Sequence, residues 1–127
     1  MVIYPSMSPD SRKKRILSVE DDADSRELLE FVLSDYEVVF AGGVKEALNA
    51  FKDANFDLCL LDSRLSDGDG TELCSRIRVL NESVPIVFAS GIGNLHDVQH
   101  AINSGAQAYL VKPYLPEELI SIVKELI

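Results

Sequence analysis

Short apolar runs alternate along the chain with longer segments in which apolar residues recur every three or four positions. The runs predict five strands, at residues 16–19, 37–41, 56–61, 84–89 and 108–111. Each strand is followed by a segment with helical spacing, as where Val44, Leu48 and Phe51 fall on one side of a helix. The pattern therefore predicts five successive strand-helix units with short connections.

Continuous apolar strands separated by amphipathic helices are typical of a parallel sheet that is covered on both faces. Right-handed crossovers then place helices on both sides, so the predicted fold class is α/β with a doubly wound five-stranded parallel sheet. In such sheets, binding sites form beyond the carboxyl ends of the strands, where the strand order reverses. The residues that follow each strand are therefore the first candidates for function.

Length, charge and cysteine content narrow the class of protein. The 127 residues suit one compact domain, which we expect over residues 15–127, after a flexible leader at residues 1–14. A net charge of −9 disfavours direct binding to nucleic acid or to an anionic membrane, and no stretch is apolar enough to cross a membrane. Two cysteines without a metal-binding spacing suit a reducing, cytoplasmic location.

Polar and charged residues follow four of the predicted strands. The first strand ends in Glu20 and Asp21, the third in Asp62, the fourth in Ser90 and the fifth in Lys112. Each of these residues alone has an ordinary explanation as a helix start, a turn or a surface side chain. Because the carboxyl ends of parallel strands meet at one edge of the sheet, we expect all five to share one crevice.

Such a crevice contains the groups that phosphoryl transfer requires. Crowded carboxylates raise one another's proton affinity and so favour a bound cation, and oxygen ligands suit Mg²⁺. A divalent ion beside Asp62 would neutralise an incoming phosphoryl group and hold it in line with the carboxylate oxygen. Lys112 would offset negative charge, and Ser90 would donate a hydrogen bond to a phosphoryl oxygen.

Four segments carry a resemblance to a known family. They are "ILSVEDD", "FDLCLLDSRLSDGDG", "VPIVFASG" and "GAQAYLVKPY", and they follow one another through the chain. As a set they resemble the receiver domain of two-component response regulators, the CheY-like superfamily, over residues 15–127. The resemblance implies a flavodoxin-like fold with strand order 2-1-3-4-5, and a phosphoprotein that acts in two-component signalling or a phosphorelay.

The resemblance also implies a role for each site residue. Asp62 would accept a phosphoryl group from the phosphohistidine of a histidine kinase, in a reaction that depends on Mg²⁺, with Mn²⁺ as an alternative ion. Lys112 and Ser90 would contact the phosphoryl group. The metal would be held by three carboxylates and one backbone carbonyl, those of Glu20, Asp21, Asp62 and Arg64 respectively.

The same resemblance implies a conformational switch and the partners that use it. Ser90 and Tyr109 would form the switch pair, the hydroxyl moving toward the phosphate while the ring turns inward. Lys112 would precede Pro113 through a cis peptide bond that aims its ammonium. We expect a sensor histidine kinase or a phosphotransfer protein as donor. A downstream effector would bind the surface formed by the fourth helix, fifth strand and fifth helix, and homodimer formation is left open.

The chain departs from the family's usual pattern at positions near the site. Ser66 stands where the family usually has proline, and Gly91 stands where it usually has alanine. Arg64 and Ile92 occupy positions that modulate the lifetime of the phosphoryl group in the family. We expect the side chain of Arg64 to affect dephosphorylation.

Three other functions compete with a signalling module that catalyses only its own phosphorylation and dephosphorylation. An aspartyl-phosphate phosphatase, which is a hydrolase, normally needs a second acid two residues after its nucleophile, and Arg64 stands there. A pseudo-receiver that binds proteins independently of phosphate would not require the acidic pair Glu20 and Asp21, nor Asp62, Ser90 and Lys112. The presence of all these residues argues against this function. A flavin-binding protein of this fold would need a Ser/Thr-rich phosphate loop, which the predicted loops lack.

The sequence does not specify the cognate kinase, the output or the oligomeric state. It also does not specify whether the chain is part of a larger regulator or hybrid kinase.

Two further patterns have simpler interpretations. Residues 67–70, Asp-Gly-Asp-Gly, resemble part of a calcium loop, but the ligand register fails. We therefore predict a turn there, with Gly70 relieving backbone strain before the next helix. His96 and His100 lie four residues apart, but without a third ligand they are interpreted as surface residues.

Overall fold

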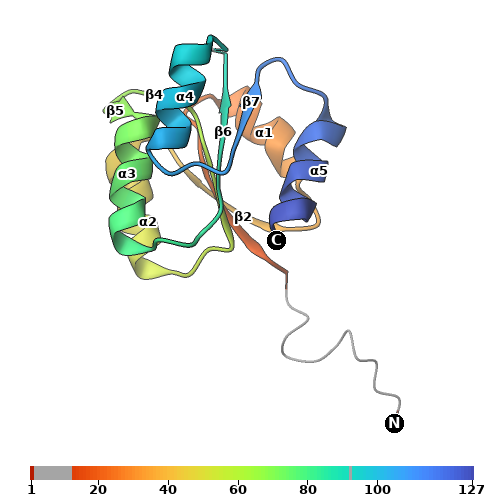
Figure 1. The fold of residues 1–127 in the computed structure, drawn as a ribbon. Coiled ribbons are helices and arrows are strands. Elements are labelled where there is room, and N and C mark those ends of the chain that lie inside the picture. Colours follow the sequence, from red (N-terminus) through yellow and green to blue (C-terminus); the bar gives the residue numbers. More distant parts are fainter. Residues whose placement is uncertain (2–12, 92) are drawn as a thin grey trace.

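The structure, a computed structural model, describes residue 1, residues 13–91 and residues 93–127. Its centre is a five-stranded parallel sheet with strand order β2-β1-β3-β6-β7 (Figure 1). The strands are β1 (Arg15–Val19), β2 (Glu37–Ala41), β3 (Leu58–Leu61), β6 (Ile86–Ser90) and β7 (Ala108–Val111). A small separate hairpin contributes β4 and β5, so this order equals the predicted 2-1-3-4-5, and the predicted α/β class is confirmed.

In the part of the chain that the structure describes, five helices cover the sheet in two groups. They are α1 (Ala23–Val32), α2 (Val44–Asp53), α3 (Gly70–Leu80), α4 (Leu95–Asn103) and α5 (Pro116–Leu126). Helices α2, α3 and α4 lie on one face of the sheet, and α1 and α5 lie on the other (Figure 1). Because each crossover passes over a face of the sheet, the paired strands of the sheet all run parallel.

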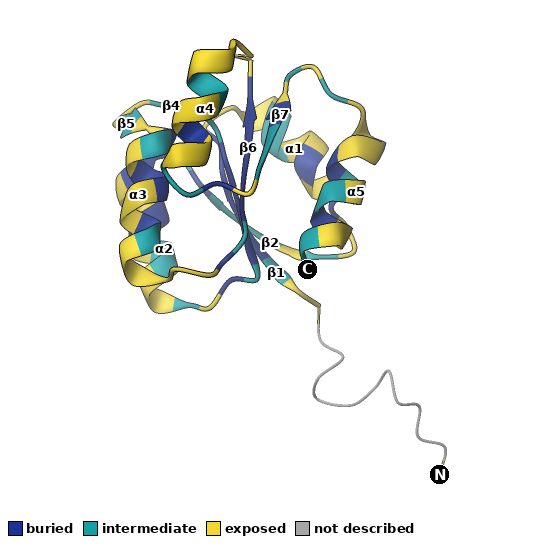
Figure 2. Ribbon diagram, in the orientation of Figure 1, coloured by how far each residue is buried: buried dark blue, intermediate teal, exposed yellow. Residues whose placement is uncertain are grey.

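The sheet is buried on both faces. Consecutive strand residues point to opposite sides, so Leu17 joins the core under α2, α3 and α4, whereas Ile16 joins the core under α1 and α5. Strands β3 and β6 are buried along their whole length. Figure 2 shows this buried layer between helices whose outer sides are exposed. In the described part of the chain, no helix has the length and apolar character needed to cross a membrane.

Three helices begin at a side chain that caps them. The carboxylate of Asp22 accepts a hydrogen bond from the backbone N–H of Ser25 at 2.9 Å, which satisfies one of the unpaired donors at the start of α1. Asp22 is therefore the N-cap residue of this helix. Asp69 caps α3 and Asn94 caps α4 in the same way.

The loop after β3 is more ordered than the predicted turn. Residues Arg64–Leu65 (β4) and Gly68–Asp69 (β5) form a two-stranded antiparallel hairpin, in which Gly68 has a φ of 157°. The role predicted for Gly70 is wrong, because its backbone φ is not in the positive range. A Cβ on Gly70 would instead collide with the carbonyl oxygen of Asp62 and lie 2.8 Å from the Phe88 ring. Gly70 is therefore required by close packing beneath the candidate site.

Two strands begin later than their apolar runs predict. Strand β3 starts at Leu58 and β6 at Ile86, although Phe56 and Val84 before them are buried. The apolar run thus marks burial, while the hydrogen-bonded strand is shorter. Helix α4 ends before Gly105, whose φ of 117° is one that glycine adopts readily.

Candidate functional site

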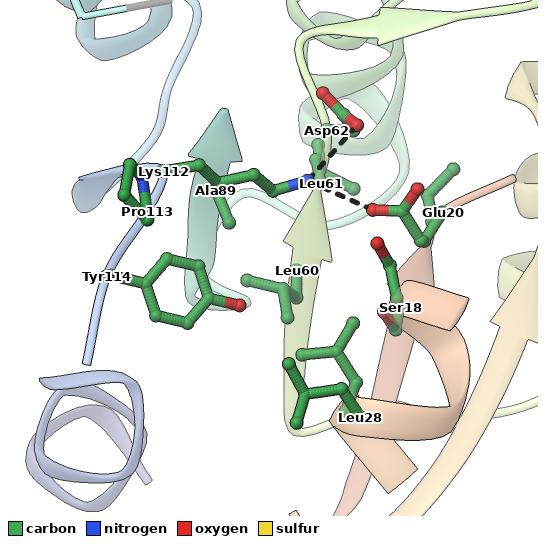
Figure 3. A pocket seen from close by; sticks show the side chains of 13 residues that line it. Ser18, Glu20, Leu28, Leu60, Leu61, Asp62, Ala89, Lys112, Pro113 and Tyr114 are labelled. Carbon is green, nitrogen blue, oxygen red and sulfur yellow. Dashed lines mark hydrogen bonds and ion pairs between the residues drawn. The ribbon is translucent and has the colours of Figure 1, made fainter. Parts of the chain in front are cut away.

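Three strand ends bring two carboxylates and one ammonium together. The Nζ atom of Lys112, after β7, lies 3.2 Å from Oε2 of Glu20, after β1, and 3.5 Å from Oδ2 of Asp62, after β3 (Figure 3). The side chains are 32%, 7% and 19% exposed, respectively. In the structure, these three residues therefore lie together at the carboxyl edge of the sheet, where the sequence predicted them.

Backbone hydrogen bonds hold these side chains at the sheet edge. The N–H of Asp62 donates to the carbonyl of Val19 at 3.3 Å, which continues the pairing of β1 and β3 by one residue. The N–H of Lys112 donates to the carbonyl of Ser90 at 2.7 Å, which does the same for β6 and β7. The Lys112–Pro113 peptide bond is cis, as the resemblance implied.

Glu20 is anchored from two further directions. Its backbone carbonyl accepts a hydrogen bond from Nε of Arg26 at 2.6 Å, and the Arg26 guanidinium lies over the Phe40 ring. Its carboxylate atom Oε1 accepts from the N–H of Asp22 at 3.1 Å, while Oε2 faces Lys112. Glu20 therefore has little freedom to turn away from the ammonium.

The charges at the site stabilise one another. Burial alone would lower the pKa of Lys112, but the negative charges of Asp62 and Glu20 and the hydrogen bond to Glu20 outweigh burial and raise its pKa above the ordinary value. Lys112 is therefore a permanent cation at neutral pH. One ammonium is shared by two carboxylates, so the three side chains together carry a net negative charge that suits a further cation.

The remaining predicted site residues lie around this centre. Ser90 ends β6 and is 2% exposed, whereas Asp21 and Arg64 are exposed. The backbone N–H of Arg64 donates to Oδ1 of Asp62 at 3.3 Å. Ile92, predicted to modulate phosphoryl lifetime, lies outside the described residues.

The predicted switch residue Tyr109 contacts the loop that follows Asp62. Its ring, in β7, stacks on Phe88 with a centroid distance of 5.8 Å and an interplanar angle of 4°. Its hydroxyl lies 3.3 Å from Oγ of Ser63, and either oxygen can be the donor. The tyrosine ring is therefore connected to the residue next to the candidate phosphoacceptor, which sequence patterns did not predict.

The donor set suits a hard divalent cation without forming a closed cage. Among the described residues, no group of three or more His, Cys, Asp or Glu side chains is arranged to hold a metal ion. Mg²⁺ keeps several waters and is usually bound through only one or two carboxylates, so a ready-made cage is not required. The carboxylates of Glu20 and Asp62, with exposed Asp21 beside them, therefore fit Mg²⁺.

Sequence reasoning missed the role of Asp67. Its carboxylate accepts hydrogen bonds from the N–H groups of Val44 at 2.7 Å and Lys45 at 3.1 Å, so it caps α2 from the loop after β3. Gly43, the residue before the helix, has no side chain to do this, and a Cβ there would collide with Asp67. The only sequence signal for this cap was that the helix follows two glycines, which have no side chain that could cap it.

Comparisons with known proteins agree with this site. The model of the response regulator receiver domain family matches residues 16–124. This chain belongs to that family. The receiver domain is 35% identical over 117 residues to the DNA-binding response regulator MtrA of Mycobacterium tuberculosis H37Rv. It is also 38% identical over 109 residues to the probable transcriptional regulator ycf27 of Guillardia theta.

Solved structures share the whole fold of this receiver domain. A two-component response regulator from Clostridium difficile is 33% identical with a TM-score of 0.86, over 90% of this chain and 95% of that one. A CheY-like receiver domain protein from Methanospirillum hungatei JF-1 is 32% identical with a TM-score of 0.85, over 90% and 93%. The matches to MtrA and ycf27 cover 91% and 84% of this chain but 51% and 42% of theirs, so this chain spans about half the length of those relatives.

Proposed function

We propose that this receiver domain accepts a phosphoryl group on Asp62 from the phosphohistidine of a sensor histidine kinase or phosphotransfer protein, in a Mg²⁺-dependent reaction. The observation that carries the proposal is the position of the Lys112 ammonium, 3.2 Å from Glu20 and 3.5 Å from Asp62 at one edge of the sheet. The aspartate is 19% exposed, so a donor can reach it. Membership of the response regulator family supports the same assignment.

The residues of this chain divide the work of phosphoryl transfer. An oxygen of Asp62 attacks phosphorus, and the histidine nitrogen of the donor leaves as the P–N bond breaks and the P–O bond forms. Lys112, whose charge is secured by its raised pKa, binds an oxygen of the transferred group and offsets its negative charge. Ser90, at the end of β6, donates a hydrogen bond to another phosphoryl oxygen.

Glu20, Asp21, Asp62 and the backbone carbonyl of Arg64 would hold the metal ion. When bound there, Mg²⁺ would neutralise charge on the phosphoryl oxygens. Glu20 is already turned inward by its bonds to Lys112 and to the N–H of Asp22. Exposed Asp21 can adjust to the ion without breaking a core contact.

Phosphorylation on Asp62 would act on Tyr109 through two neighbours. Ser90 would move toward the phosphoryl group, and the loop that contains Ser63 would shift with Asp62, which changes the contact between Ser63 and the Tyr109 hydroxyl. Tyr109 lies in β7, beside the α4–β7–α5 surface on which we place the downstream effector. The match covers only 51% of MtrA and 42% of ycf27. This supports an output that is supplied by a further domain or by a separate partner.

Incubation with acetyl phosphate and Mg²⁺, followed by intact mass measurement, tests the proposal. We expect a gain of one phosphoryl group that is absent in Asp62→Asn and in the presence of EDTA. Asp57→Asn is the matched control, because Asp57 lies at the opposite end of β3, where its carboxylate accepts from the N–H of Arg15. A mass gain that persists in Asp62→Asn, or no gain in the wild type, would contradict the assignment.

A further inference from the structure

Arg26 of α1 holds the backbone of the turn that carries Glu20 and Asp21. Its Nε atom donates to the carbonyl oxygen of Glu20 at 2.6 Å. Its guanidinium lies over the Phe40 ring, with 5.7 Å between Cζ and the ring centroid, and both side chains are half-buried. The hydrogen bond therefore joins the first helix to the end of β1, directly beside the two acidic residues that we assign to the metal ion.

The loop after β2 leaves room for this guanidinium. A Cβ on Gly42 would lie 3.2 Å from Nη2 of Arg26 and 3.2 Å from Oε2 of Glu46. The same Glu46 oxygen accepts a hydrogen bond from the N–H of Gly42 at 2.8 Å, which holds the loop beside the guanidinium. On its other side, Glu20 is fixed by its N–H, which donates to the carbonyl of Ala41 at 2.9 Å. The turn is therefore restrained by β2 and by Arg26 together.

We propose that Arg26 is a positioning residue for the metal ion, and that it raises the affinity for Mg²⁺ by fixing the backbone of Glu20 and Asp21. The inference rests on the proposed function, which assigns the carboxylates of these two residues to the ion. Mg²⁺ requires nearly ideal octahedral geometry, so small errors in ligand position weaken its binding. Asp21 is exposed, and the position of its carboxylate therefore depends on the backbone that Arg26 holds.

The charge of Arg26 alone would act in the opposite direction. A guanidinium near a cation site repels Mg²⁺, so loss of the charge by itself would tighten binding. Loss of the hydrogen bond to the Glu20 carbonyl would let the ligands move and would weaken binding. Positioning and charge therefore predict changes of opposite sign in the affinity for Mg²⁺.

Titration of the unphosphorylated protein with MgCl₂, followed by amide chemical shifts in ¹H–¹⁵N NMR spectra, tests the proposal. Arg26→Met keeps an unbranched stem but has no donor. We expect its Kd for Mg²⁺ to rise about tenfold, the lower end of the range for residues that orient a metal ligand. Arg26→Gln keeps a donor without the charge, because its amide nitrogen is as many bonds from Cα as Nε of arginine. Its Kd should stay within about twofold of the wild-type value.

Arg15→Met is the matched control. Arg15 also lies over an aromatic ring, that of Phe56, with 5.3 Å between Cζ and the ring centroid, but it lies at the opposite end of β1. Its loss should leave the Kd for Mg²⁺ unchanged. Phosphorylation by acetyl phosphate gives a second readout. Arg26→Met should need about tenfold more Mg²⁺ for half-maximal phosphorylation of Asp62, with an unchanged rate at saturating Mg²⁺.

Several outcomes would overturn the inference and leave the proposed function intact. One is a wild-type Kd in Arg26→Met. Tighter binding in both Arg26→Met and Arg26→Gln would show that only the charge matters. Equal weakening in these two variants would remove the hydrogen bond as the cause, and equal weakening in Arg15→Met would show a general loosening of the domain.

Two further results are assigned in advance. If Arg26→Met does not fold, Phe40→Leu removes the ring under the guanidinium but keeps an apolar side chain. It should raise the Kd for Mg²⁺ about threefold, and an unchanged Kd there would reject the inference. The absence of saturable shifts with MgCl₂ in the wild type would contradict the metal site of the proposed function itself, and the inference with it.

Discussion

The two faces of the sheet carry cores of different size. Among the described residues, the core under α2, α3 and α4 contains 17 buried residues, whereas the core under α1 and α5 contains 10. The smaller core borders a cavity of about 380 Å³, and Glu20, Asp62 and Lys112 lie at the rim of this cavity. The face with the larger core is closed by three helices, while the other face leaves space next to the charged site.

The largest expected effect comes from truncating a leucine on each face. Leu17→Ala, in the larger core, should lower the free energy of unfolding by about 3–5 kcal/mol, because it leaves a closed void. Leu60→Ala should cost less, about 2–3 kcal/mol, because Leu60 already borders a cavity and loses fewer packed neighbours. Urea unfolding measures both values. Equal losses would show that the cavity does not loosen the α1–α5 face.

Removing the ammonium should have the next largest effect. Lys112→Met leaves Glu20, which is 7% exposed, facing Asp62 without a cation, and should cost about 1–2 kcal/mol at neutral pH. Since the folded-state pKa of Lys112 is raised, its contribution is complete below the ordinary value of 10.5 and is lost as pH rises through the folded-state pKa.

Unfolding of wild type and Lys112→Met across the alkaline range measures this difference. The two stabilities should converge as Lys112 of the wild type loses its proton. Lys45→Met, at an exposed position on α2, is the control and should show no such convergence. A constant difference between wild type and Lys112→Met at all pH values would argue against a charge-based contribution.

A smaller effect is expected for Asp67, on the face that carries α2. Hydrogen bonds from the N–H groups of Lys45 and Val44 lower the pKa of Asp67, so its contribution is present above the ordinary value of 3.8 and is lost as pH falls through the folded-state pKa. Asp67→Ala should increase amide hydrogen exchange at Val44 and Lys45 without unfolding the domain. Asp35→Ala, an exposed control, should leave this exchange unchanged.

The smallest effect is expected at the contact between Ser63 and Tyr109. Their oxygens are 3.3 Å apart, which is long for a hydroxyl pair, so Ser63→Ala should cost about 0.5 kcal/mol. Tyr109→Phe should cost a similar amount, and the double variant should cost less than the sum, as measured in a double-mutant cycle. Strict additivity would mean that the two hydroxyls do not interact.

Much of the fold was predictable because the signals are local. Apolar runs mark the buried strands, and stripes of apolar residues mark the helices, so the five strand-helix units followed directly from the order of residues. The positions of Glu20, Asp62 and Lys112 at strand ends were predictable for the same reason, since parallel strands all place their carboxyl ends at one edge. Strand starts were less accurate, because Phe56 and Val84 are buried without belonging to a strand.

Contacts between distant segments could not be read from local patterns. Asp67 caps a helix that begins 23 residues earlier in the chain, and Tyr109 meets Ser63 across 46 residues. The need for Gly70 comes from the carbonyl of Asp62 and the ring of Phe88, which approach it only in the folded domain. Each depends on which side chains meet in space.

The amino-acid sequence by itself determined a parallel α/β sheet with acidic residues and a lysine at one edge. The spacing of apolar residues and the direction of each strand depend only on residues that are neighbours in the chain. Only the tertiary structure decided that one ammonium is shared by two carboxylates, and that a mostly apolar cavity lies beside them. Distances and voids depend on how helices settle on the sheet, and that packing sums many weak contacts between residues far apart in sequence.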